Sequence, residues 1–114
     1  MTAKNEIWKI RCVKSYPQAR NHILIGRIAH QDSAAITIHC KTFHYGSVIN
    51  GIKDVETGAL DKRIIPWSRV EIVNVLDEDF SYQTATLKTD DQNNIILASG
   101  KKACLIASPR ERNY

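Results

Sequence analysis

Apolar and polar residues alternate along much of this chain, and that alternation predicts β-strands. Between residues 7 and 14, Trp8, Ile10 and Cys12 are separated by polar residues such as Lys9. A period of two places the apolar side chains on one face of an extended strand. No long stretch has apolar residues at the three- and four-residue spacing of an amphipathic helix, so we expect an all-β fold.

Two longer runs predict a hairpin. The first covers residues 22–30 and the second covers residues 34–45, with Gln31, Asp32 and Ser33 as the turn between them. Gly26 interrupts the first run, and a glycine inside a strand usually marks a bend or a close approach of two backbones.

The rest of the chain predicts shorter strands. Apolar strands at 63–65 and 70–76 flank a turn that begins with Pro66, because proline presets the backbone angle that a tight turn requires. The remaining expected strands cover residues 48–53, 82–88, 94–98 and 102–107, and the last two form a hairpin.

Short strands with short connections favour antiparallel pairing, because a parallel pair needs a longer crossover. We therefore expect one domain over residues 1–114, namely a small, strongly bent antiparallel barrel with additional β-strands at 80–108.

Composition narrows the cellular setting. The apolar stretches are far shorter than the roughly 20 residues that cross a bilayer, and the first six residues are polar, so we expect a cytoplasmic chain that does not enter a membrane. The three cysteines, Cys12, Cys40 and Cys104, have no CxxC spacing. Their odd number favours buried thiols over a disulfide framework or a zinc site.

Catalytic and cofactor motifs are missing from the sequence. None of the five glycines has the spacing of a phosphate-binding loop. On a strand, Cys40 and His44 share a face while His39 points away, which leaves two metal ligands where a closed zinc site needs four. We therefore expect no enzymatic activity, no metal and no cofactor.

Residues 22–76 resemble the Sm/LSm family, which includes the bacterial Sm-like RNA chaperones. The first matching element is Ile25-Gly26-Arg27-Ile28 followed by Asp32, and the second runs from Lys62 to Ile72 through Pro66-Trp67-Ser68-Arg69. The resemblance implies an Sm-like or SH3-like barrel, a homo-oligomeric ring of six or seven subunits joined by edge strands, and single-stranded RNA at the pore. Two RNA-contact positions differ, since Ile36 replaces the family's asparagine and Pro66-Trp67 replaces its Arg-Gly.

Charge also bears on RNA. Residues 1–30 carry six basic and one acidic side chain within a net charge of +4, and a basic region attracts phosphate. The candidate RNA-binding residues combine bases with a stacking ring; they are His30, Asp32, Lys62, Arg63, Trp67 and Arg69. The alternative is structural: Trp67 fills the barrel end or a subunit contact, while Lys62, Arg63 and Arg69 pair with Asp61 and Glu71.

Two functions therefore fit the sequence. The first is an Sm-like barrel that self-assembles and binds single-stranded RNA through basic and aromatic turn residues. The second is a non-enzymatic protein-interaction or assembly module on the same barrel, in which the additional strands cover an edge that a ring would need and a protein partner takes the place of RNA.

Overall fold

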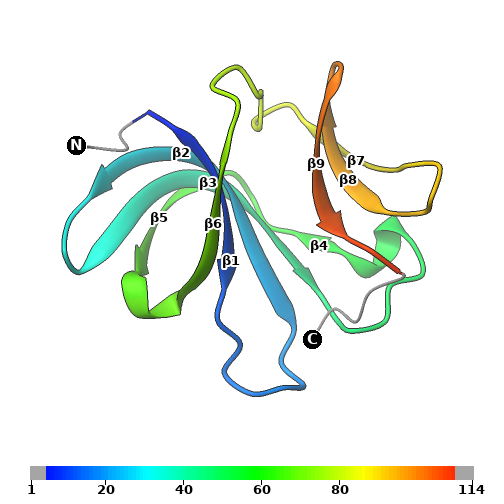
Figure 1. Ribbon diagram of the computed structural model, residues 1–114, viewed down its shortest axis with the longest axis horizontal. Helices are drawn as coiled ribbons and strands as arrows, with labels where there is room; N and C mark the ends of the chain where they lie inside the picture. Colours follow the sequence, from blue (N-terminus) through cyan, green and yellow to red (C-terminus); the bar gives the residue numbers. More distant parts are fainter. Residues whose placement is uncertain (1–4, 110–114) are drawn as a thin grey trace.

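The computed structural model describes residues 5–109 and folds them into two antiparallel β-sheets (Figure 1). The all-β prediction is confirmed, because the helical segments in this part of the chain are single 3-10 turns, η1 (Ile52–Asp54) and η2 (Trp67–Arg69). No helix among these residues is long and apolar enough to cross a membrane.

The larger sheet contains six strands. Its strands are β1 (Ile7–Cys12), β2 (Asn21–Gln31), β3 (Ala35–Tyr45), β4 (Glu56–Thr57), β5 (Asp61–Pro66) and β6 (Val70–Leu76). The order is β4-β3-β2-β1-β6, and β5 continues along the same edge of β3 as β4. Within the described chain, β5 and β6 are the outermost strands at the η2 end.

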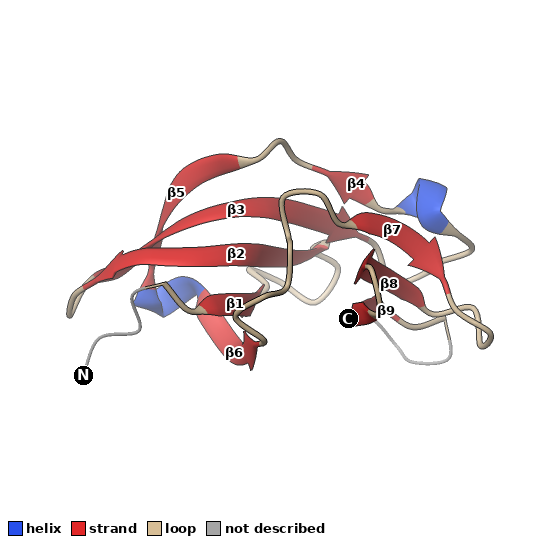
Figure 2. Ribbon diagram, turned by 90° about the horizontal axis from the view of Figure 1, so that it is seen from above, coloured by secondary structure: helices blue, strands red, loops and turns tan. Residues whose placement is uncertain are grey.

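The smaller sheet consists of β7 (Thr86–Thr89), β8 (Ile95–Ser99) and β9 (Lys102–Ala107) in that order. It lies beside the end of the large sheet that is remote from η2, as both ribbon views show (Figure 2). The predicted hairpin of the last two strands is confirmed.

The large sheet is strongly curved but it is not a closed barrel. The long β2–β3 hairpin arches over β1 and β6 (Figure 2). β5 pairs with β3 and β6 pairs with β1, and no ladder between β5 and β6 closes the described sheet. η2 joins the two strands only at their ends.

Two predicted strands differ from the structure. Residues 48–53 form no strand, because the Asp54 carboxylate accepts a bond from the Asn50 N–H and tightens the segment into η1. The strand predicted at 82–88 begins only at Thr86, because a turn in which the N–H of Ala85 bonds the carbonyl of Ser81 comes first.

Gly26 stands where β2 and β3 touch. It pairs with Cys40, and a Cβ at position 26 would lie 2.0 Å from the carbonyl oxygen of His39 and 2.6 Å from Cα of Cys40. Only glycine permits this contact without moving a backbone, so the close approach predicted at Gly26 is confirmed.

Apolar side chains form two separate cores, one on each face of the large sheet. The core inside the curve, called here the Trp8 core, holds the even-numbered apolar residues of β1–β3, and Ile65, Trp67, Val70 and Val73 pack against its edge. The second core lies between the opposite face and the small sheet. It contains Ile7, Ile23, Ile25, Phe43, Tyr45, Tyr82, Ile95, Leu97 and Ile106 among others.

The second core also contains a polar link between the sheets. The Tyr45 hydroxyl on β3 donates a 2.9 Å bond to the carbonyl of Ile106 on β9, and the Tyr45 side chain is buried. The three cysteines are buried and free, as predicted.

Replacement of Gly26 by alanine tests the contact between β2 and β3. We expect Gly26→Ala to lower the free energy of unfolding by at least about 2 kcal/mol, because the added methyl overlaps backbone atoms. Urea denaturation measures the change. Gly46→Ala is the matched control, because a Cβ there meets nothing within 4 Å, and a similar loss in both variants would contradict this account.

Candidate functional site

Three of the six sequence candidates lie together where the β2–β3 turn meets η2. The His30 Nε2 and Asp32 Oδ2 atoms are 3.7 Å apart, and the Trp67 indole N–H donates a 2.7 Å bond to the Asp32 carbonyl. The backbone N–H of Trp67 also donates to the Ala34 carbonyl, and this bond fixes η2 against the turn.

Two members of this cluster, Asp32 and Trp67, also have a structural task. The Asp32 carboxylate accepts the N–H groups of Ala34 and Ala35, and these bonds hold its pKa below the ordinary aspartate value. The Trp67 ring lies 6.5 Å from the Trp8 ring and packs against the Trp8 core. Trp67 is therefore only partly exposed and is not a free platform for base stacking.

Arg63 does not join the cluster. Its guanidinium donates 2.9 Å bonds to the carbonyls of Cys40 and Ala59, so it ties β5 to β3 and to the preceding loop. Burial raises the pKa of the Cys40 thiol, while Arg63 acts in the opposite sense.

Lys62 and Arg69 lie apart from one another. Lys62 is exposed on β5 and pairs across the ladder with His39. Arg69 ends η2, and its carbonyl accepts the N–H of Val13. Of the six candidates, His30, Asp32 and Trp67 are thus joined by contacts, while the Arg63 side chain bonds other groups.

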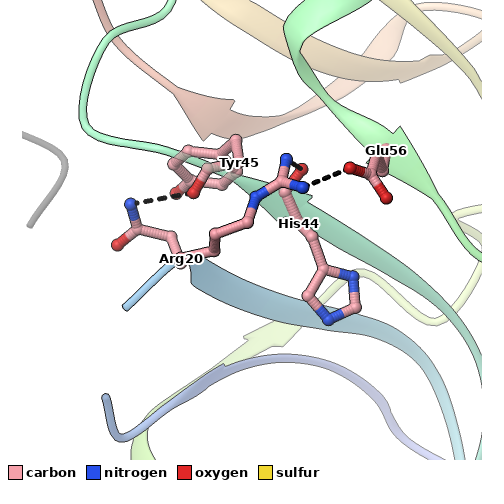
Figure 3. Close-up of polar contacts among 5 residues, drawn as sticks. Arg20, His44, Tyr45 and Glu56 are labelled. Carbon is pink, nitrogen blue, oxygen red and sulfur yellow. Dashed lines mark hydrogen bonds and ion pairs between the residues drawn. The ribbon is translucent and has the colours of Figure 1, made fainter. Parts of the chain in front are cut away.

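A second polar group lies at the far end of the β2–β3 hairpin. His22 and His44 are cross-strand partners whose rings stack with centroids 4.0 Å apart. Beside them the Arg20 guanidinium bonds the Glu56 carboxylate and the carbonyl of His44 (Figure 3). The ion pair links the loop before β2 to β4.

The pKa of each histidine in the pair is lowered. Burial, then the charges of His44, Arg69 and Arg63, lower the pKa of His22 to about 4. Burial also lowers the pKa of His44, and Arg20 adds to that effect. Among residues 5–109 no group of three or more His, Cys, Asp or Glu side chains is arranged to hold a metal ion.

A third group was missed by the sequence analysis. Arg27, His39 and Lys62, called here the basic row, are successive partners across β2, β3 and β5, and such partners project from the same face. That face is opposite the Trp8 core, since Ile38 and Cys40 on either side of His39 point into that core. Residues from three distant segments align only once the register is known.

A hollow of about 490 Å³ adjoins the basic row. Its walls include Arg27, His39, Tyr82 and Gln83. The Tyr82 hydroxyl lies 2.8 Å from His39 Nδ1, and Tyr82 itself is buried. Burial raises the pKa of Tyr82, and the nearby Arg27 opposes the rise.

Comparison of the chain with family models, with curated proteins and with solved structures gave no match. Functional assignment therefore depends on the geometry of these groups.

The depressed pKa of His22 predicts acid-sensitive stability. In the unfolded chain His22 takes up a proton below about pH 6.5, whereas in the folded chain it does so only near pH 4, because its pKa is lowered. Stability therefore falls as the pH falls through this window, by about 1–2 kcal/mol after allowance for partial exposure of the ring.

Urea denaturation of His22→Phe at several pH values between 4 and 7 measures this contribution. We expect a shallower loss of stability than in the parent chain, because the ring remains but no longer titrates. An unchanged slope in His22→Phe would refute the assignment.

Proposed function

We propose that this chain is an Sm-like module that self-assembles through its edge strands and, once assembled, binds single-stranded RNA. The observation that carries the proposal is the pair of open edges, one on each side of the strand order of one curved sheet. β5 pairs only with β3, and β6 pairs only with β1, among the described strands. An open edge offers unpaired N–H and C=O groups to another strand.

Both edge strands also expose large apolar side chains. Ile64 on β5 is 70% exposed, and on β6 Ile72 is 49% and Val75 59% exposed. Pairing β5 of one copy with β6 of the next would bury these side chains and satisfy both edges. Because the two edges differ, the contact is head-to-tail, which closes into a ring when the rotation per subunit divides a full turn.

The additional strands leave these edges free. β7, β8 and β9 pair with one another and with neither β5 nor β6 in the described part of the chain. They cover a face of the large sheet rather than an edge. In this placement the additional strands leave β5 and β6 available to neighbouring copies.

Three local features support an Sm-like module. Gly26 permits a close strand contact, Asp32 caps the backbone of the following turn, and η2 links β5 to β6 in a single helical turn. These are the features on which the resemblance of residues 22–76 rests. The open sheet differs from the expected closed barrel, and in the proposed assembly neighbouring copies complete the strand pairing.

RNA is the proposed ligand because some basic side chains are exposed and can contact phosphate, while others are held by bonds within the subunit. Arg63 and Trp67 are held by bonds within the subunit, so they support the site rather than contact RNA. Exposed His30, Lys62 and Arg69 are the sequence candidates left to meet phosphate.

Light scattering tests the assembly. We expect a particle six or seven times the 12.9 kDa mass of the chain. Ile72→Lys should reduce it to monomers, because a lysine on an edge strand opposes pairing with another strand. Leu105→Lys is the matched control, since Leu105 is similarly exposed but lies on β9. A monomeric parent chain would refute the ring.

Filter binding of a single-stranded RNA oligonucleotide tests the ligand. We expect retention at low salt and an affinity that falls at least tenfold between 50 and 200 mM salt, because bound phosphates release counterions (~10³-fold for six contacts). Absence of retention at low salt would remove RNA from the proposal and leave the assembly intact.

A protein-interaction module is the second candidate, and the same exposed edges favour it. An extended segment of a different protein would add to β5 or β6 by strand addition. A monomer in light scattering that binds no RNA would favour this alternative.

A further inference from the structure

We infer that the basic row and its adjoining hollow form a phosphate-binding site for the backbone of single-stranded RNA. The inference rests on the proposed function and assigns its RNA contacts to the face opposite the Trp8 core. The turn cluster of His30, Asp32 and Trp67 is not the principal site.

The register places three basic side chains next to one another. Arg27, His39 and Lys62 come from adjacent strands, and strands lie about 4.8 Å apart, so the row extends over about 10 Å. Arg27 and Lys62 carry positive charge on either side of His39. A phosphate bound along the row would be attracted to both charges.

Tyr82 orients the middle member of the row. Its ring packs edge-on against the His39 imidazole, and its hydroxyl meets Nδ1 at 2.8 Å. When that hydroxyl donates to Nδ1, the proton of the neutral imidazole lies on Nε2. His39 then offers an N–H donor to an anion without having to be charged.

The other two members supply charge. Arg27 donates a 2.7 Å bond from Nη1 to the Asn5 carbonyl, which limits the movement of its guanidinium. A guanidinium can contact phosphate through two parallel N–H groups, whereas a lysine acts as a point charge. Lys62 is exposed on β5, so its side chain can follow a flexible chain.

None of the described residues that line the hollow is acidic. Asp61 is adjacent to Lys62 in sequence, but it pairs with Cys40 and so belongs to the opposite face. Asp77 and Asp79, in the loop that leads to Tyr82, are bound by Lys102.

The length of the row favours a chain of phosphates over a single ion. A row of about 10 Å is longer than one phosphate group, so a free phosphate would meet only part of it. An RNA strand that crosses β2, β3 and β5 would place successive phosphates near Arg27 and Lys62.

The test compares charge-matched variants in RNA filter binding. We expect Arg27→Gln and Lys62→Gln each to weaken RNA binding by about five- to tenfold and to reduce the slope of log affinity against log salt by about 1. Lys88→Gln is the control, because Lys88 is an exposed lysine on β7 of the small sheet. It should bind RNA like the parent chain.

Tyr82→Phe tests the orientation of His39. It removes only the hydroxyl, and we expect about threefold weaker binding with an unchanged salt slope, because no charge is lost. Thermal melting and light scattering must show that each variant folds and assembles like the parent chain; Lys62→Gln, exposed at the surface, keeps the test decisive if another variant is unstable.

The outcomes separate the two proposals. If the parent chain binds RNA and Lys62→Gln binds it equally well, the basic row is refuted and the proposed function stands. If the parent chain binds no RNA, the ligand of the proposed function is wrong as well. A last experiment adds inorganic phosphate or unlabelled RNA as a competitor of the bound RNA. If millimolar phosphate competes as well as RNA at the same concentration of phosphate groups, the site binds the free ion and the RNA assignment is overturned.

Discussion

The contact between β2 and β3 at Gly26 is the constraint on which the rest of the fold depends. With no Cβ at this position, the backbones of Gly26 and Cys40 meet closely enough for the hairpin to curve. The curvature encloses the Trp8 core on one side of the sheet. It also leaves β5 and β6 at the outside, each with an edge that no other described strand pairs.

The central strands are covered on both faces, which explains the composition of the hairpin. Leu24 and Ile28 point into the Trp8 core, while Ile23 and Ile25 point into the core shared with the small sheet. In a simple barrel the outer face of the sheet would be exposed to solvent. Here the small sheet covers one end of that face, and the uncovered end carries the basic row.

Local patterns in the sequence were enough to find most strands, because alternation and turn chemistry are properties of neighbouring residues. The strands at 70–76 and 102–107 match the structure. The strand predicted at 48–53 was wrong, because the bond that the Asp54 carboxylate accepts outweighs a weak apolar pattern. The site was less predictable, since the alignment of Arg27 with His39 and Lys62 depends on pairing between distant segments, and since the internal bonds of Arg63 and Trp67 depend on tertiary contacts.

The bond from Tyr45 to the Ile106 carbonyl joins the two sheets within a shared apolar core. If the small sheet detached, the Tyr45 hydroxyl and ring would lose their partners together, and the apolar side chains of Phe43 and Ile95 would face water. A state in which only the large sheet remains folded is therefore costly. Residues 80–108 are best regarded as part of the same folding unit as the curved sheet, so a chain shortened to residues 22–76 would lack half of one core and an edge partner for β6.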